Sequence, residues 1–233
     1  MTTDWITPDW AAPARVHAVS TTRSGGVSTG PYASLNLGDH VGDADEAVTE
    51  NRRRVREALN LKQEPRWLRQ VHRTAVARLD GSAVTEPSDA AVTDRPGETC
   101  VIMTADCLPV LLCDRNGSVV AAAHCGWRSM AAGVLESTVK AMWVERGALL
   151  AWLGPAIGPQ AYEVGDEVMQ AFVDYDVHAT AAFQHQPNGK WLCDLYALAR
   201  MRLQALGVKE IYGGGLCTFS DTARFFSYRR DGE

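Results

Sequence analysis

The segment Leu108-Pro-Val-Leu-Leu-Cys-Asp-Arg-Asn-Gly-Ser-Val-Val-Ala-Ala-Ala-His124 decides the fold class of this chain. It contains two apolar runs, Leu108–Cys113 and Ser118–His124, separated by Asp114-Arg-Asn-Gly117, a combination typical of a tight turn. Two apolar runs joined by such a turn predict an antiparallel hairpin. Because neither run alternates between apolar and polar residues, we expect both strands to be buried on both faces.

Other short apolar runs predict further strands along the chain. They cover Arg15–Thr21, Trp67–Val71, Ala75–Leu79, Cys100–Ala105, Leu149–Leu153, Glu210–Tyr212 and Phe225–Tyr228.

Helical spacing of apolar residues predicts helices in the remaining segments. One is expected to begin at Asp43, which would form a capping box with Glu46. The others cover Ala131–Met142 with Gly147 as C-cap, Gly165–Val173, and Asp194–Leu206 before Gly207.

These strands and helices do not alternate strictly, and no repeat or Pro/Gly/Ser-rich linker divides them. The pattern therefore favours an α+β fold over a Rossmann-type fold. We expect a single catalytic domain over residues 1–233, with mixed, largely buried β-sheets flanked by helices.

Composition excludes several classes of function. The net charge of −5 argues against a nucleic-acid partner, because such proteins cluster Lys and Arg against phosphates. The N-terminus resembles no signal peptide, and no apolar stretch approaches the length of a membrane span. We therefore expect a cytoplasmic protein with reduced cysteines. The acidic balance is compatible with a small anionic substrate, and of the possible oligomeric states we favour a monomer.

Three metal-capable residues lie at the ends of predicted strands. His72 closes the run that begins at Trp67, Cys107 directly precedes Leu108, and His124 ends the hairpin. Two imidazoles and one thiolate match the ligands of a catalytic zinc site with one open position. Spacing alone does not distinguish this site from histidines that serve only packing.

Several motifs, in order along nearly the whole chain, carry a family resemblance. They are Arg23-Ser-Gly-Gly-Val-Ser28, Gln70-Val-His72, Thr104-Ala-Asp-Cys-Leu-Pro109, His124-Cys-Gly-Trp-Arg128, Leu153-Gly-Pro-Ala-Ile-Gly-Pro159 and Phe225-Phe-Ser-Tyr-Arg-Arg230. In these motifs the chain resembles the bacterial YfiH family, also called the laccase-domain or multicopper polyphenol oxidoreductase family. Cys125 departs from the pattern, since alanine is usual at this position.

The resemblance implies a zinc-dependent enzyme of purine nucleosides. The expected activity is phosphorolysis of adenosine, inosine and methylthioadenosine, together with adenosine deamination. By motif, the metal ligands and catalytic residues fall on His72, Cys107 and His124. The YfiH-like fold is classified with CNF-like cysteine hydrolases.

Further residues are candidates for binding substrate or phosphate. Arg23 lies in a Ser/Gly-rich loop and Arg128 follows His124, so either guanidinium could bind an anion or form a structural ion pair. Asp106 and Glu163 are candidate acid–base groups, and His40 is a candidate pocket residue.

Two other enzyme classes stay open at the level of sequence. A His₂Cys set also suits copper, which would fit a polyphenol oxidase, although six histidines are few for a multicopper enzyme. Alternatively, Cys107 could be the nucleophile of a Cys–His hydrolase. The same residues could also form the zinc site of an amidohydrolase, and either enzyme could act on a cell-wall precursor.

Overall fold

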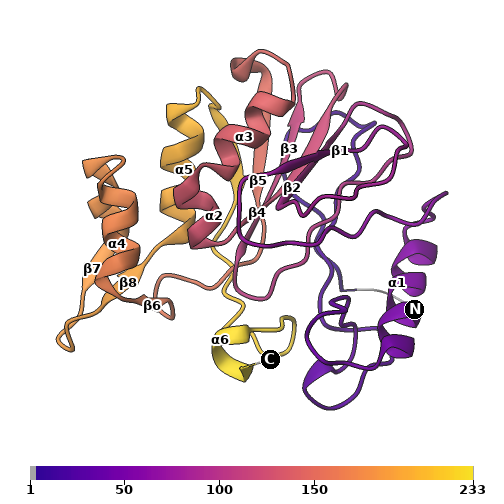
Figure 1. Cartoon of the computed structure of the whole chain (residues 1–233), viewed down its shortest axis with the longest axis horizontal. Helices are drawn as coiled ribbons and strands as arrows, with labels where there is room; N and C mark the ends of the chain where they lie inside the picture. The colour runs from indigo at the N-terminus through magenta and orange to yellow at the C-terminus, as the bar shows by residue number, and fades with distance from the viewer. Residues whose placement is uncertain (1–3, 233) are drawn as a thin grey trace.

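The computed structural model describes residues 4–232, and the predicted hairpin lies at the centre of its larger sheet (Figure 1). Strands β3 (Leu108–Asp114) and β4 (Val120–Cys125) pair antiparallel, with Leu111 opposite Ala122. Gly117 adopts a φ of +62° in the turn and donates its N–H to the Asp114 carbonyl at 2.9 Å. The hairpin is therefore confirmed.

Six strands form this sheet in the order β1-β2-β4-β3-β5-β9. The outer members are β1 (Val76–Arg78), β2 (Ala90–Thr93), β5 (Leu149–Leu153) and β9 (Glu210–Gly213). The β1–β2 and β5–β9 pairs are parallel, and the other three pairs are antiparallel. The sheet is therefore mixed, as the α+β prediction requires.

Helices cover one face of this sheet. They are α2 (Trp127–Ala132), α3 (Val134–Ala141) and α5 (Leu195–Ala205), which stand together on one side in Figure 1. Val110 and Leu112 of β3 share one core cluster with Leu135 of α3 and Leu203 of α5, each at most 1% exposed. Burial of these apolar side chains fixes the helices against the sheet.

The helix predicted over Ala131–Met142 is in fact two helices. Gly133 separates them, because its φ of +100° lies in the left-handed region that ends a right-handed helix. The second helix ends at Ala141, so Gly147 is not its C-cap and lies instead in a short 3₁₀ turn.

A second, antiparallel sheet lies beside the helices. Its central strand β8 (Trp191–Cys193) pairs with β6 (Glu163–Val164) and β7 (Phe183–His185) and packs against α4 (Asp166–Val173). The remaining elements are α1 (Asp45–Ala58), α6 (Tyr228–Asp231) and 3₁₀ turns at Gly30–Tyr32, Arg146–Ala148 and Val177–Ala182. No helix among residues 4–232 has the length and apolar character needed to cross a bilayer.

Four predicted strands are wrong. Residues Arg15–Thr21, Trp67–Val71 and Cys100–Ala105 form no regular ladder, and only Ser20 makes an isolated bridge, to Ile6. Phe225–Tyr228 instead leads into α6, with Ser227 as its N-cap. Their apolar pattern indicates burial, but a strand also needs a neighbour with which to exchange hydrogen bonds.

The predicted capping box is also wrong. Helix α1 begins at Asp45 after Ala44, which provides no side-chain cap. The Asp43 carboxylate accepts hydrogen bonds from Ser28 and Asn36 instead, so it ties the loop before the helix to the N-terminal loop.

Asp106 joins the central strands to the C-terminal segment. This residue is 8% exposed and has a φ of +88°. Its carboxylate accepts hydrogen bonds from Thr218 Oγ1 at 2.6 Å, Ser227 Oγ at 3.0 Å and the Arg229 N–H at 2.7 Å. Three donors on one buried carboxylate fix the segment that leads into Cys107.

We predict that Asp106→Ala lowers the free energy of unfolding by about 3 kcal/mol, because it leaves buried donors without an acceptor. Glu57→Ala is the control, since Glu57 is exposed in α1 and its ion pair with Arg53 contributes at most about 1 kcal/mol. Urea denaturation of both variants makes the comparison. Equal losses would show that the Asp106 contacts contribute no more than a surface ion pair.

Candidate metal centre

His72, Cys107 and His124 lie together at one end of the β3–β4 hairpin. Their candidate ligand atoms are all within 4.8 Å of one another, and Cys107 Sγ is 3.8 Å from His72 Nε2. At zinc bond lengths, two tetrahedral ligands are about 3.3–3.8 Å apart. The Cys107–His72 separation therefore fits one shared ion.

Three different elements supply these side chains. His124 is on β4, opposite Pro109, and is 3% exposed. Cys107 is half-buried immediately before β3, while His72 is exposed in a loop and has a φ of +57°. The two imidazole rings meet edge to face, with centroids 4.7 Å apart. The set is thus closed on the His124 side and accessible on the His72 side.

Asp89 holds the ring of His124 and the backbone of the loop that carries His72. Its fully buried carboxylate is 2.8 Å from His124 Nδ1 and accepts backbone N–H groups of Val71, His72 and Arg73 at 2.7–3.1 Å. The Nδ1 contact leaves Nε2 of His124 as the ring nitrogen free to bind a metal. A carboxylate behind a histidine ligand is a recurrent feature of zinc sites.

Gly126 leaves the space in which the side chains meet. A Cβ at this position would lie 2.9 Å from Cys107 Sγ and 2.8 Å from His72 Cδ2. Such contacts are shorter than real Cβ atoms tolerate, so only glycine allows the two side chains to approach here.

The electrostatics of the three groups favour a thiolate. Burial raises the pKa of the Cys107 thiol, but hydrogen bonds and charge from His124 and His72 outweigh it and bring the pKa to about 7. Burial likewise lowers the pKa of His124, yet Asp89 and Cys107 raise it to about 9. For Asp89, burial is outweighed by hydrogen bonds from His124 and the 71–73 backbone, so its pKa is lowered. A thiolate is the form of cysteine that binds metals and attacks electrophiles.

The two candidate anion-binding arginines differ in their surroundings. Arg23 donates to the carbonyls of Ala33 and Thr222 at 2.9 and 3.2 Å and stacks on Phe226. Arg128 is exposed and lies 4.4 Å from the Trp127 ring, and no hydrogen bond or ion pair to the described residues 4–232 engages its guanidinium. Arg128 therefore retains the donors that an anion would need.

Arg128 is the second residue of α2, the helix that begins directly after Gly126. Burial raises the pKa of Tyr162 most, with the charges of Cys193 and Cys107 adding to it and those of Arg229 and Arg128 opposing it. The charges of Cys107 and Arg128 therefore shift the pKa of the Tyr162 hydroxyl in opposite directions. The Arg229 guanidinium is 5.3 Å from the Tyr162 ring.

The other candidates lie outside this cluster. The Glu163 carboxylate binds Lys190 and Asn188, which lowers its pKa, and His40 is exposed beside Asp39. Both Asp106 oxygens are engaged by the C-terminal segment, as described above. Cys125 is fully buried beneath the site, and burial raises its pKa well above the ordinary value.

Sequence reasoning missed Asp89 and Gly126. Asp89 directly precedes the short run Ala90–Thr93, which was not predicted as a strand. A lone acidic residue before a buried strand is the only local signal for its role.

The family description "Multi-copper polyphenol oxidoreductase laccase" matches residues 17–233 of the chain. The chain belongs to this family. A purine nucleoside phosphorylase of Pseudomonas aeruginosa is 58% identical over 227 residues, which cover 97% of this chain and 93% of the relative. The purine nucleoside phosphorylase YfiH of Escherichia coli K12 is 53% identical over the same shares of the two chains.

Solved structures of the family have the same fold. A Neisseria meningitidis protein superposes with a TM-score of 0.93 at 50% identity, covering 98% of this chain and 94% of its own. YlmD from Geobacillus stearothermophilus superposes with a TM-score of 0.86 at 32% identity, covering 94% and 88%. Both confirm the predicted YfiH-like α+β fold.

We predict that Asp89→Asn weakens zinc binding by about 10- to 100-fold, because the amide no longer provides a charged acceptor for the His124 Nδ1–H. Competition with a chromophoric zinc chelator measures the affinity. Asp94→Asn is the control, since Asp94 is exposed after the same strand and its carboxylate pairs with Arg78 alone among the residues that the structure describes. An unchanged affinity in Asp89→Asn would show that Asp89 does not tune a metal ligand.

Proposed function

We propose that this chain is a zinc-dependent purine nucleoside phosphorylase that acts on adenosine, inosine and methylthioadenosine and also deaminates adenosine. The observation that carries the proposal is the accessible His₂Cys set backed by a buried carboxylate. This is the ligand pattern of a catalytic rather than a structural zinc site, which would have four protein ligands. The relatives from Pseudomonas aeruginosa and Escherichia coli are purine nucleoside phosphorylases, which supports the phosphorylase activity.

The donor set and its surroundings fit zinc. His72, Cys107 and His124 would hold the ion, and Gly126 keeps the space between them open. A bound zinc ion would polarise a substrate oxygen or a water molecule. Asp89 fixes the ring of His124 through Nδ1 and the backbone of His72 through its N–H, so one imidazole and the loop that carries the other are held in place before any ligand binds.

Phosphorolysis also requires a site for a phosphate dianion beside the sugar. A net charge of −5 provides no attraction from the protein as a whole, so local donors must supply it. Arg128 suits this role because its guanidinium is exposed, has no hydrogen bond or ion pair to residues 4–232, and lies on α2, which begins directly after Gly126. We assign Arg23 a smaller part, because its Nε and Nη1 already bind backbone carbonyls.

One observation favours a second candidate, a cysteine hydrolase. Cys107, His124 and Asp89 form a chain of thiol, imidazole and carboxylate, with a His124–Asp89 contact of 2.8 Å and a thiol pKa of about 7. The same arrangement activates nucleophilic cysteines. In that reading Cys107 attacks a substrate carbonyl and His124 protonates the leaving group.

The geometry gives less support to a multicopper oxidase. Of the six histidines in the sequence, only His72 and His124 join the metal-capable group. Residues 4–232 contain no second group of this kind. Any copper chemistry would have to use a single ion.

We predict that a chelator abolishes inosine phosphorolysis and that added zinc restores it. Cys107→Ser should lose both zinc and activity, whereas Cys100→Ser should keep both, since Cys100 is a half-buried thiol outside the cluster. Metal content and hypoxanthine release are measured on the same preparations. Full activity without metal, combined with loss on thiol alkylation, would favour the hydrolase and contradict the zinc mechanism.

We predict that Arg128→Ala weakens the use of phosphate by roughly 10- to 100-fold. A charge-assisted contact contributes about 1.5–3 kcal/mol, and 1.4 kcal/mol corresponds to a factor of ten. Phosphorolysis is measured against phosphate concentration, and ammonia release from adenosine is measured without phosphate. Deamination should change less, because it consumes water instead.

The matched control is Arg78→Ala, which removes an exposed arginine paired with Asp94 and should leave both reactions unchanged. Equal losses in both reactions of Arg128→Ala would mean that Arg128 holds the nucleoside or the fold. No loss in either would place the phosphate site elsewhere.

A further inference from the structure

Asp106, which directly precedes the metal-capable cysteine, holds two further segments of the chain. Its main-chain carbonyl accepts the N–H of Ile157 at 2.9 Å, and its carboxylate accepts the N–H of Arg229 at 2.7 Å. Tyr162 follows about one turn after Ile157, where its N–H donates to the Gly158 carbonyl at 3.1 Å. The segments that carry Tyr162 and Arg229 are therefore both fixed next to the metal-capable group.

The side chains of Tyr162 and Arg229 lie against one another. The Arg229 guanidinium is 5.3 Å from the centre of the half-buried Tyr162 ring, and its Nη1 donates to the Glu163 carbonyl at 2.7 Å. This hydrogen bond joins α6, which carries Arg229, to the start of β6 (Figure 1). The guanidinium is thereby held across the tyrosine ring.

Most donors of this pair have no partner in the protein. Of the five N–H donors of the Arg229 guanidinium, only one on Nη1 engages a group within residues 4–232. The Tyr162 hydroxyl makes no hydrogen bond to the same residues, and burial raises its pKa, so it keeps a proton to donate. The Glu163 carboxylate is paired with Lys190 and Asn188. Unpaired donors are ordinary on an exposed arginine, so their place beside the metal-capable group is what makes this pair a candidate site.

Two guanidinium charges act on the Tyr162 hydroxyl. Burial raises its pKa most, and the charges of Arg229 and Arg128 both oppose that rise. Arg128 comes from the start of α2, two residues after Gly126, where a Cβ would lie 2.9 Å from Cys107 Sγ. Cations from two different elements therefore flank one phenol.

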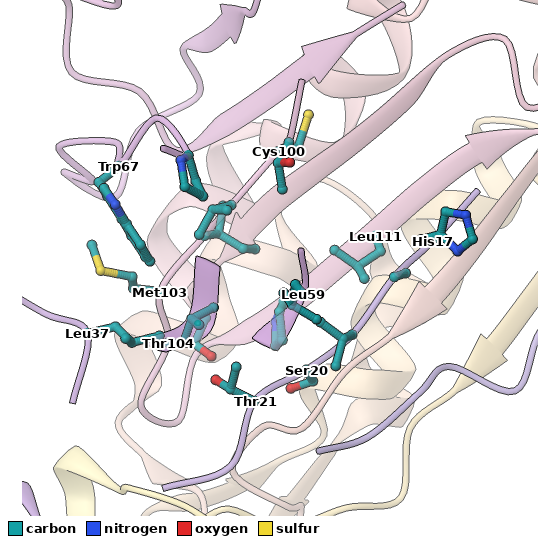
Figure 2. Close-up of a pocket in the computed structure, with 18 of the residues that line it drawn as sticks. His17, Ser20, Thr21, Leu37, Leu59, Trp67, Cys100, Met103, Thr104 and Leu111 are labelled. Carbon is teal, nitrogen blue, oxygen red and sulfur yellow. The ribbon is translucent and has the colours of Figure 1, made fainter. Parts of the chain in front are cut away.

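Arg23 has different surroundings from these two arginines. It lines a cavity of about 800 Å³ that Leu111 and Met103 also border (Figure 2). None of the three metal-capable residues lines that cavity, and neither Arg128 nor Arg229 does. An anion held by Arg23 would therefore be separate from the metal-capable group.

We propose that Tyr162 and Arg229 form a binding site for inorganic phosphate beside the metal centre, with Arg128 as its second cation. The choice of phosphate rests on the function proposed above. Nε and Nη2 of Arg229 form the fork of the guanidinium that no described group engages, and such a fork binds two phosphate oxygens in parallel. The Tyr162 hydroxyl provides a donor for a third oxygen.

The test measures binding of inorganic phosphate to the purified protein by isothermal titration calorimetry. Arg229→Ala removes the fork but keeps the main-chain N–H that Asp106 accepts, and Tyr162→Phe removes only the hydroxyl. Arg229→Ala should weaken phosphate binding by about 10- to 100-fold and Tyr162→Phe by about tenfold. Arg229→Lys should recover only part of the loss, because it keeps the charge without the fork.

The matched controls are Tyr212→Phe and Arg224→Ala. Tyr212 donates to Glu210 at 3.0 Å, and Arg224 pairs with Asp221 in the same C-terminal segment as Arg229. Both controls should bind phosphate as the unsubstituted chain does. In kinetics, the site variants should raise the KM for phosphate in inosine phosphorolysis, while ammonia release from adenosine changes by less than about twofold.

Phosphate binding within about twofold of the unsubstituted chain in Tyr162→Phe and Arg229→Ala would overturn the proposal, even if inosine is cleaved. Equal weakening in the controls would also overturn it, because the loss would then not depend on this pair. Weakening confined to the site variants, without any inosine cleavage, would support the anion site and contradict the phosphorylase function. If Arg229→Ala does not fold by urea denaturation, Tyr162→Phe decides, since it keeps the packed ring.

Discussion

The Asp89 carboxylate is the contact on which the arrangement of the candidate site depends. It is fully buried, yet it accepts three backbone N–H groups from residues 71–73 and contacts the imidazole of His124. A buried carboxylate is costly unless its oxygens are satisfied, and here four contacts satisfy them. One group thereby fixes a loop and a strand that are about fifty residues apart in sequence.

The hydrophobic core supplies the rigid base for this contact. Strands β3 and β4 are paired at the centre of the sheet and share one core with α3 and α5, so Cys107 and His124 are held by a packed hairpin. Asp106 adds a second anchor by binding the C-terminal segment. Within residues 4–232, four non-glycine residues have a positive φ, and two of them, His72 and Asp106, belong to or adjoin the ligand set. Such backbone conformations persist where the surrounding contacts determine them.

The same contacts serve two chemistries. A thiolate beside two imidazoles can share a metal ion, and a thiolate with a His–Asp pair can attack a carbonyl. Both need Asp89 in the same place and both benefit from a thiol pKa near 7. The two chemistries use His72 differently. It would be the third ligand of a metal ion, but a triad of Cys107, His124 and Asp89 does not require it. Its separation of 3.8 Å from Cys107 supports the metal.

The sequence by itself determined the fold class, the central hairpin and the three residues of the metal-capable group. These follow from local patterns, namely apolar runs, a turn with glycine at its end, and motifs of a known family. It predicted helix α5 closely because Asp194 caps its start, and strand β5 because it is a continuous apolar run. Helix α4 was also predicted closely, although no side chain caps it. Only the tertiary structure decided the role of Asp89, the space left by Gly126 and the engagement of Arg23, since these depend on residues distant in sequence. It also decided that residues 15–21 and 100–105 form no ladder. Local sequence indicates whether a segment can be extended, but a strand exists only where the fold places another backbone within hydrogen-bonding distance.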